Sequence, residues 1–144
     1  HDAGDEVLRS VSEILQGRTR AEDIACRLGG EEFALVYPGM PAEVAIGRVE
    51  SILKEVEAHE IYHLGKKLEP VTLSAGIAVF PSHAADTDAL LHAADQALYQ
   101  SKKAGRNQST LADLPEQQAT TTPSPIKLVH SALKPTALKR AAGG

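Results

Sequence analysis

The fold is decided by Arg-Leu-Gly-Gly-Glu-Glu-Phe-Ala-Leu-Val, residues 27–36. Two adjacent glycines, Gly29 and Gly30, separate two short apolar runs. Because glycine adopts positive φ without steric cost, a Gly-Gly pair between such runs predicts a β-hairpin. The next two residues, Glu31 and Glu32, are like charges that repel each other unless a cation such as a metal ion lies beside them. A solvated acidic turn is the alternative that this stretch alone leaves open.

The overall composition excludes several classes of protein. The chain has 144 residues, no Trp and 3% aromatic residues, so one domain with an aliphatic core is expected. A net charge of −4 argues against sequence-independent nucleic-acid binding. The single Cys26 excludes an intramolecular disulfide, and its place in an apolar strand pattern predicts a small buried side chain.

The chain contains no apolar run long enough to span a membrane and no signal peptide, so we expect no membrane contact and a cytoplasmic location. It starts with His1 rather than Met, so we expect it to begin inside a larger protein, whose upstream region could be tethered to a membrane.

Helical and strand patterns alternate through residues 1–112. A helix precedes the hairpin, and the order continues helix, strand, helix and short strand. This order predicts an α+β fold, with an antiparallel-rich central sheet and helices packed on it. Gly76, inside the central strand, indicates a bulge or a close backbone approach. Besides the hairpin, the predicted segments are helices at 5–17, 42–58 and 86–104, strands at 71–80 and 107–112, and a loop at 59–67.

The composition changes after residue 112. Residues 113–144 contain half of the eight prolines and a Thr/Pro-rich centre, which is typical of a disordered tail. Within it, residues 126–129 form a short apolar stretch that could dock transiently. We therefore predict a domain at 1–112 and a disordered tail at 113–144.

Several ordered motifs together resemble the GGDEF family of diguanylate cyclases. The Gly-Gly-Glu-Glu-Phe stretch is similar to the signature of that family, and the resemblance extends over roughly residues 1–108. The other motifs are Gly4-Asp5 with Leu8 before the first long helix, Leu73–Ala78 in the central strand, Ala94–Tyr99 in the last helix and Lys102–Asn107 in the turn after it.

The resemblance implies a palm-like nucleotide-cyclase fold and the condensation of two GTP into cyclic di-GMP and two pyrophosphates across a homodimer. It implies Glu31 as ligand of Mg²⁺ (or Mn²⁺) and general base, and Glu32 as a second acid. Hard divalent cations prefer carboxylate oxygens, which agrees with this assignment. Gly29 and Gly30 would let the nucleotide approach the backbone.

The resemblance also implies further substrate-binding residues. Asp5 would accept hydrogen bonds from guanine, His1 would lie near the nucleotide, and Lys102 and Arg106 would reach the triphosphate. Asp5, Lys102 and Arg106 each have a structural alternative, because an acid at a helix start and cations at a helix end stabilise the helix.

Arg20 and Asp23 match the Arg-x-x-Asp inhibitory product site of the family, and Arg27 is a third candidate there. Arginine forks to phosphate and stacks on guanine, while the carboxylate reads the guanine edge. The arginine that some members carry on the next helix is not matched, because Arg48 stands a few positions away. A degenerate module that only binds cyclic di-GMP is the alternative function, and a purely structural dimerisation domain is a third.

One departure from the family pattern concerns its first strand, which precedes the motifs found here. That strand and the loop after it supply a metal-binding aspartate and contacts to phosphate and guanine in the family. The chain therefore holds half of the implied metal site and lacks a central strand, and we expect it not to make cyclic di-GMP alone.

Overall fold

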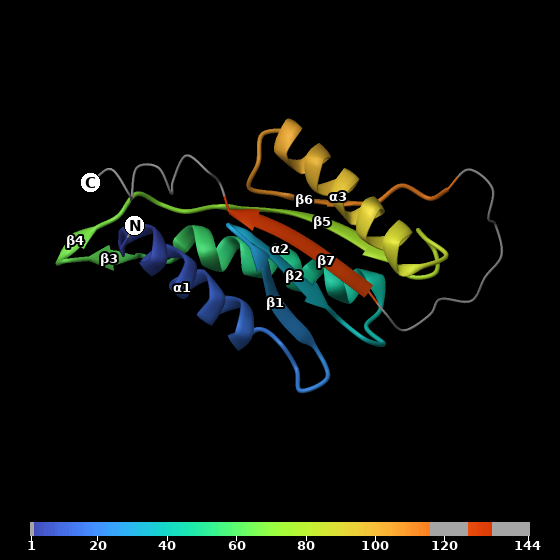
Figure 1. The fold of residues 1–144 in the computed structure, drawn as a ribbon, viewed down its shortest axis with the longest axis horizontal. Coiled ribbons are helices and arrows are strands. Elements are labelled where there is room, and N and C mark those ends of the chain that lie inside the picture. The colour runs from blue at the N-terminus through green and yellow to red at the C-terminus, as the bar shows by residue number, and fades with distance from the viewer. Residues whose placement is uncertain (1, 116–126, 134–144) are drawn as a thin grey trace.

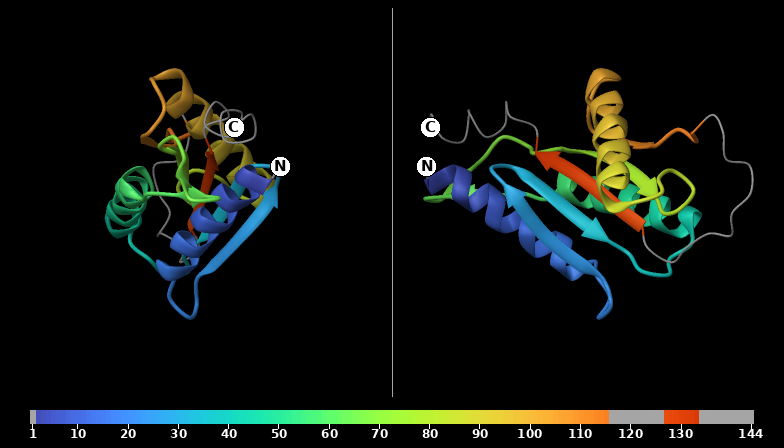
Figure 2. Two further views of the ribbon diagram at one scale, coloured as in Figure 1. Left: turned by 90° about the vertical axis from the view of Figure 1, so that its left-hand side faces the viewer. Right: turned by 45° about the vertical axis from the view of Figure 1, so that its right-hand side comes forward.

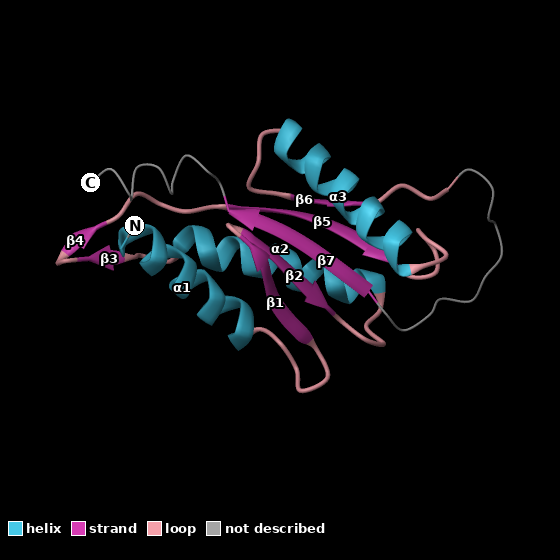
Figure 3. Cartoon of the chain, viewed as in Figure 1, coloured by secondary structure: helices cyan, strands magenta, loops and turns pink. Residues whose placement is uncertain are grey.

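The computed structural model describes residues 2–115 and 127–133. A five-stranded sheet with the order β1-β2-β7-β5-β6 forms the centre, and a separate two-stranded hairpin, β3-β4, extends from it (Figures 1 and 3). The elements are α1 Asp2–Gly17, β1 Ile24–Gly29, β2 Glu32–Val36, α2 Ala42–Ala58, β3 Tyr62–His63, β4 Lys66–Lys67, β5 Leu73–Val79, α3 Thr87–Lys103, β6 Ser109–Leu111 and β7 Lys127–Leu133.

Helices cover the sheet from both sides, as the views in Figures 1 and 2 show. Alternate residues of β2 enter two different cores: Phe33 and Leu35 pack with α1 and α2, and Ala34 packs with α3. The predicted apolar faces of α1 and α2 are buried, which confirms both helices. The buried residues of these faces are Val7, Val11 and Leu15 in α1 and Ala45, Val49, Ile52, Leu53 and Val56 in α2. Leu8 and Ile14, also predicted on the α1 face, are partly buried against the same core.

The face toward α3 is lined by small residues. Asp86 caps the start of this helix by accepting a hydrogen bond from the Ala89 N–H at 2.8 Å. A Cβ at Gly76 would overlap the carbonyl oxygen of Ala94 and the backbone nitrogen of Leu98. Of the two roles predicted for Gly76, the structure therefore confirms the close backbone approach.

Strand β7 lies in the part of the chain that the sequence predicted to be disordered. Residues 127–133 pair antiparallel with both β2 and β5, in the middle of the sheet. The pairing has a physical reason: β2 and β5 each need a hydrogen-bonding partner along the edge that faces the other, and β7 supplies both. Residues 116–126 and 134–144 of the predicted tail lie outside the described residues.

Two smaller expectations differ from the structure. Residues 59–67, predicted as a loop, contain the β3-β4 hairpin, whose turn places Leu64 and Gly65 at φ 51° and 76°.

Cys26 is exposed rather than buried, as are its neighbours Ile24 and Leu28. Strand β1 is at the sheet edge, and α3 packs over β5, β6 and β7 instead. Among the described residues, no helix therefore covers this face of β1.

Candidate functional site

The Gly-Gly-Glu-Glu turn joins β1 to β2. Gly29 and Gly30 have φ of 146° and 53°, values that other residues rarely adopt, which explains the glycine pair. Gly29 pairs with Glu32, and a register irregularity precedes it between Arg27 and Gly29. The Arg27 guanidinium donates a hydrogen bond from Nε to the Gly30 carbonyl at 2.8 Å. A side chain of β1, that of Arg27, therefore holds the turn in its conformation.

Both carboxylates of the turn are accessible. Glu31 is half-buried and Glu32 is exposed, and neither forms a hydrogen bond or ion pair with another described residue. Two free carboxylates on a fixed turn suit one side of a divalent cation. The part of the chain that the structure describes holds no cluster of three or more His, Cys, Asp or Glu residues that could complete such a site. The residues present thus fit half of a metal site.

Other predicted substrate-binding residues lie at the same end of the sheet as the turn. Figure 1 shows the N-terminal end of α1, which carries Asp5, at this end. The register places the starts of β2, β5 and β6 there as well, because Glu32 is level with Ala132 and Leu73 is level with Leu133. The loop before β6 carries Arg106 to this end. His1 lies outside the described residues.

The loop after α3 has a defined position. Arg106 and Asn107 have φ of 64° and 50°, the left-handed region that non-glycine residues seldom adopt. The Arg106 N–H donates to the Ser101 carbonyl at 2.9 Å, and the Asn107 N–H donates to Ser74 Oγ at 3.2 Å. These bonds tie the loop to α3 and β5. Lys102 and Arg106 are half-buried and exposed respectively, at the end of α3 where cations also favour the helix dipole.

A second cluster lies at the opposite end of β1. The Arg20 guanidinium binds Asp23 through Nη2 at 2.7 Å and Nε at 3.0 Å, and the Arg20 backbone N–H donates to the same carboxylate at 2.7 Å. Arg20 Nη2 also donates to the Pro38 carbonyl at 3.0 Å. The structure thus brings the predicted pair together. It does not bring Arg27 to it, because that side chain contacts the turn at the other end of the strand.

Arg48 from α2 completes the cluster. In the sequence it stands a few positions from the place where some members of the family carry an arginine. Its Nη1 lies 3.4 Å from Asp23 Oδ2, and its guanidinium lies 5.7 Å from the centre of the Tyr37 ring. The Asp23 side chain is 0% exposed. Burial raises its pKa, but the hydrogen bonds and charge of Arg20 and the charge of Arg48 lower it more, so the pKa lies below its ordinary value. A buried carboxylate that stays ionised holds both arginines in place.

Tyr37 supports this cluster from the core. Its ring is buried, and its hydroxyl has no hydrogen-bond partner among the described residues. Burial raises the pKa of Tyr37 to about 12. A raised pKa in the folded state gives stability that is complete below the unfolded pKa, near 10.0, and is lost as the pH rises through about 12.

We expect Tyr37→Phe to change the alkaline unfolding of the protein. At pH 7 the free energy of unfolding should change by no more than about 1 kcal/mol, because an unpartnered buried hydroxyl contributes little. Above pH 10 the variant should lose stability less steeply than the wild type. Urea unfolding measured at several pH values checks this. Tyr99→Phe, at a tyrosine 63% exposed, is the control and should retain the wild-type slope. Equal slopes for Tyr37→Phe and the wild type would contradict the expectation.

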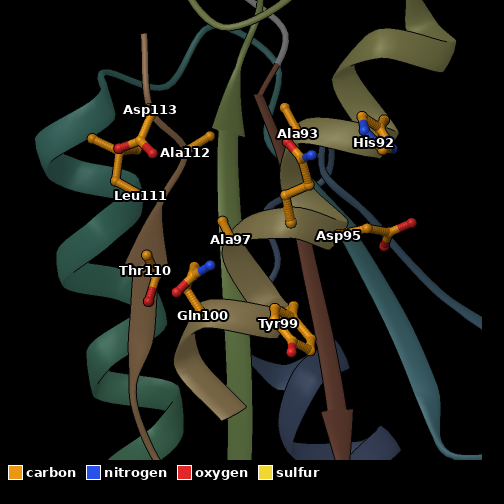
Figure 4. A pocket seen from close by; sticks show the side chains of 11 residues that line it. His92, Ala93, Asp95, Ala97, Tyr99, Gln100, Thr110, Leu111, Ala112 and Asp113 are labelled. Atoms are coloured by element: carbon orange, nitrogen blue, oxygen red, sulfur yellow. The ribbon is translucent and has the colours of Figure 1, made fainter. Parts of the chain in front are cut away.

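A groove of about 500 Å³ lies elsewhere, between α3 and β6 (Figure 4). Its walls include Asp95 and Tyr99 from α3 and Thr110 and Asp113 from the β6 region. The groove contains neither the turn nor the Arg20–Asp23 cluster. It is therefore not part of the two sites that the sequence predicted.

The fold and the turn together define the class of protein: an α+β domain with a helix-covered sheet, in which a hairpin turn presents two carboxylates. A family model described as "Diguanylate cyclase, GGDEF domain" matches residues 1–108. The chain belongs to the GGDEF family, which confirms the predicted family and fold class.

Relatives and solved structures agree with this membership. The chain is 40% identical over 112 residues to Diguanylate cyclase A of Treponema denticola and 38% identical over 109 residues to the response regulator PleD of Caulobacter vibrioides. These matches cover 78% and 74% of this chain but only 30% and 24% of the relatives. The chain thus spans less than a third of the length of these two proteins.

Two solved structures of GGDEF-family domains are similar to this chain. The GGDEF domain of DgcB from Caulobacter crescentus in complex with c-di-GMP matches with a TM-score of 0.72 and 33% identity, over 77% of this chain and 66% of that one. The active GGEEF domain of a diguanylate cyclase from Vibrio cholerae matches with a TM-score of 0.71 and 30% identity, over 80% and 72%. Among the described residues, no helix has the length and apolar character needed to cross a membrane.

Proposed function

We propose that the protein is a diguanylate cyclase, which joins two GTP molecules into cyclic di-GMP and releases two pyrophosphates. The observation that carries the proposal is the Gly-Gly-Glu-Glu turn, with two free carboxylates, in a chain that belongs to the GGDEF family. Two copies would face each other, each holding one GTP. Residues 1–112 would form most of the cyclase domain, in the cytoplasm where GTP is available, and β7, from residues 113–144, would complete its central sheet.

The residues at the turn end of the sheet have complementary roles in this reaction. Mg²⁺ or Mn²⁺ would neutralise phosphate charge and activate the 3′-hydroxyl when bound. Glu31 would hold the cation and take the proton of the 3′-hydroxyl, as its oxygen bonds to the α-phosphorus of the other GTP and the bond to pyrophosphate breaks. Glu32 would support it as the second acid. Gly29 and Gly30 leave the backbone open to the nucleotide, since neither has a neighbour that restricts approach.

Recognition of GTP would come from the elements around the turn. Asp5 is exposed near the start of α1, where its carboxylate can accept hydrogen bonds from the N1–H and N2–H₂ groups of guanine. Lys102 and Arg106 would bind the triphosphate, and His1 would lie near the nucleotide. A degenerate module that only binds cyclic di-GMP is not favoured, because the matched relatives include proteins named diguanylate cyclases and both carboxylates of the turn are kept.

The function is tested by incubating the full-length protein with GTP and Mg²⁺ and separating the products by chromatography. Cyclic di-GMP and pyrophosphate in a ratio of one to two are expected. ATP in place of GTP should give far less cyclic dinucleotide, since guanine presents two donors, N1–H and N2–H₂, to a carboxylate, whereas the N1 of adenine is an acceptor that a carboxylate repels. Absence of cyclic di-GMP from a folded protein that binds GTP and metal would contradict the proposal.

We further propose that Arg20 and Asp23, with Arg48 beside them, bind cyclic di-GMP as an inhibitory product. The cluster presents two arginines around one buried carboxylate, which suits a ligand with phosphates and a guanine edge. Arg20 is the member whose side chain is 35% exposed and can reach a ligand.

Arg20→Ala should relieve product inhibition while the initial rate stays within about twofold, because the cluster lies at the opposite end of β1 from the turn. Progress curves with and without added cyclic di-GMP measure this effect. Arg9→Ala removes an arginine from exposed ion pairs on α1 and is the matched control. Unchanged inhibition in Arg20→Ala would mean that the pair is only a structural ion pair.

A further inference from the structure

We propose that two buried serines, Ser74 of β5 and Ser101 of α3, are positioning residues for Arg106. They hold the backbone of the loop that carries Arg106, and so fix the point from which its guanidinium extends. This role rests on the proposed function, in which Arg106 binds the triphosphate of GTP. The two serines are 4% and 0% exposed, so they act through the loop and do not touch a nucleotide themselves.

Both serines bind the loop, at consecutive backbone groups. Three polar residues are buried among those that the structure describes, Ser10, Ser74 and Ser101, and the last two converge here. The Arg106 N–H donates to the Ser101 carbonyl at 2.9 Å, and the Asn107 N–H donates to Ser74 Oγ at 3.2 Å. Since a buried hydroxyl is costly without a hydrogen-bond partner, the loop and Ser74 satisfy each other.

The loop needs these anchors because its backbone conformation is unfavourable. Gly105, Arg106 and Asn107 have φ of 120°, 64° and 50°. Glycine adopts such values freely, but at an arginine the left-handed conformation brings the Cβ too close to the following carbonyl oxygen. A residue keeps this conformation only where the surrounding structure determines it. The hydrogen bonds to Ser74 and Ser101 provide that constraint at Arg106 and at the residue after it.

Ser101 is itself fixed to the sheet. Its hydroxyl donates to the Ala75 carbonyl at 2.8 Å and lies 2.6 Å from the Thr110 hydroxyl. Because Ser101 has one hydroxyl hydrogen, Thr110 is then the donor between the two hydroxyls. This network joins the last turn of α3 to β5 and β6. The carbonyl that holds Arg106 therefore has a position that three elements determine.

The side of the loop that faces α2 is less tightly packed. A groove of about 390 Å³ separates Leu53 and Lys54 of α2 from Asn107 and Gln108. The Arg106 side chain is exposed and forms no hydrogen bond or ion pair with another described residue. A fixed backbone with an unpaired guanidinium favours ligand binding, because little ordering remains when a phosphate binds. Loss of an anchor should therefore weaken triphosphate binding while the guanidinium itself is kept.

Equilibrium binding of α,β-methylene GTP, an analogue that cannot release pyrophosphate, tests this role in the full-length protein with Mg²⁺. Ser74→Ala removes the acceptor of the Asn107 N–H and should raise the dissociation constant roughly threefold to tenfold, the effect of one hydrogen bond. Ser74→Thr keeps the hydroxyl oxygen and should restore the wild-type affinity. Ser10→Ala, at a buried serine on α1, is the matched control and should bind like the wild type.

A double-mutant cycle with Arg106 separates positioning from a general effect on the fold. In the Arg106→Ala background, Ser74→Ala should change the dissociation constant by less than twofold, because the residue through which Ser74 acts is absent. Equal effects of Ser74→Ala in both backgrounds, or wild-type affinity of a folded Ser74→Ala protein, would overturn the role. If Ser74→Ala does not fold, Thr110→Val loosens the anchor at Ser101, and the same cycle is measured with it.

Turnover of GTP tests the proposed function separately. A protein that shows the expected cycle but makes no cyclic di-GMP would support the positioning role and contradict the cyclase. Formation of cyclic di-GMP with equal effects in both backgrounds would contradict the positioning role alone. A wild-type protein that binds neither GTP nor the analogue would contradict both.

Discussion

Replacing Glu31 by Gln should lower the rate of cyclic di-GMP formation by roughly 10²–10⁴-fold, the range typical for loss of a general base. The amide keeps the shape of the side chain but loses the charge that would hold a cation and accept a proton. In the structure, Glu31 has no hydrogen bond or ion pair with another described residue, so its removal should not disturb the fold. The full-length protein is assayed with GTP and Mg²⁺.

Two controls make this experiment specific. Glu43→Gln makes the same chemical change at an exposed residue in the first turn of α2 and should retain the wild-type rate. GTP affinity and melting temperature, measured for both variants, should stay near those of the wild type. Wild-type turnover by Glu31→Gln would remove this carboxylate from the mechanism, and the cation would then have to be held elsewhere.

The sequence predicted the parts of the fold in which local patterns and tertiary packing agree. Helices α1 and α2 have their apolar residues on one face, and that face is the buried one. The hairpin followed from Gly29 and Gly30, because a turn of this kind requires positive φ. The Arg20–Asp23 pair was found through its match to the Arg-x-x-Asp site of the family, and the structure shows that the two side chains meet.

The remaining features depend on contacts between distant segments. Nothing local to residues 127–133 shows that two strand edges far away in sequence lack a partner, so the position of β7 could not be derived. Arg48 joins Asp23 across 25 positions, through the orientation of α2. Cys26 lies in an alternating apolar pattern that is typical of a buried strand. Whether its side chain is buried depends on two tertiary features that the pattern does not contain: the place of β1 at the sheet edge and the strands that α3 covers. The β3-β4 hairpin has only two residues in each strand, too few for a detectable pattern.

Gly76→Ala should be the most destabilising small substitution in the sheet. A Cβ at this position would overlap the Ala94 carbonyl oxygen and the Leu98 backbone nitrogen, and would lie 2.9 Å from the Leu98 Cα. All three atoms belong to the backbone of α3, so no side chain can rotate away and the helix itself must shift. Overpacking typically costs about 1–3 kcal/mol, and we expect about 3 kcal/mol or more here.

The effect of Gly76→Ala on stability is measured by urea unfolding and by the melting temperature, which should fall by roughly 10 °C or more. Gly47→Ala is the matched control, because Gly47 is exposed in the middle of α2 and a Cβ there meets nothing within 4 Å. Since alanine favours helix more than glycine does, this variant should gain up to about 1 kcal/mol. The same substitution should thus have opposite signs at the two positions. A Gly76→Ala protein as stable as the wild type would show that α3 can move away from β5 at little cost, and that the small-residue face does not determine their spacing.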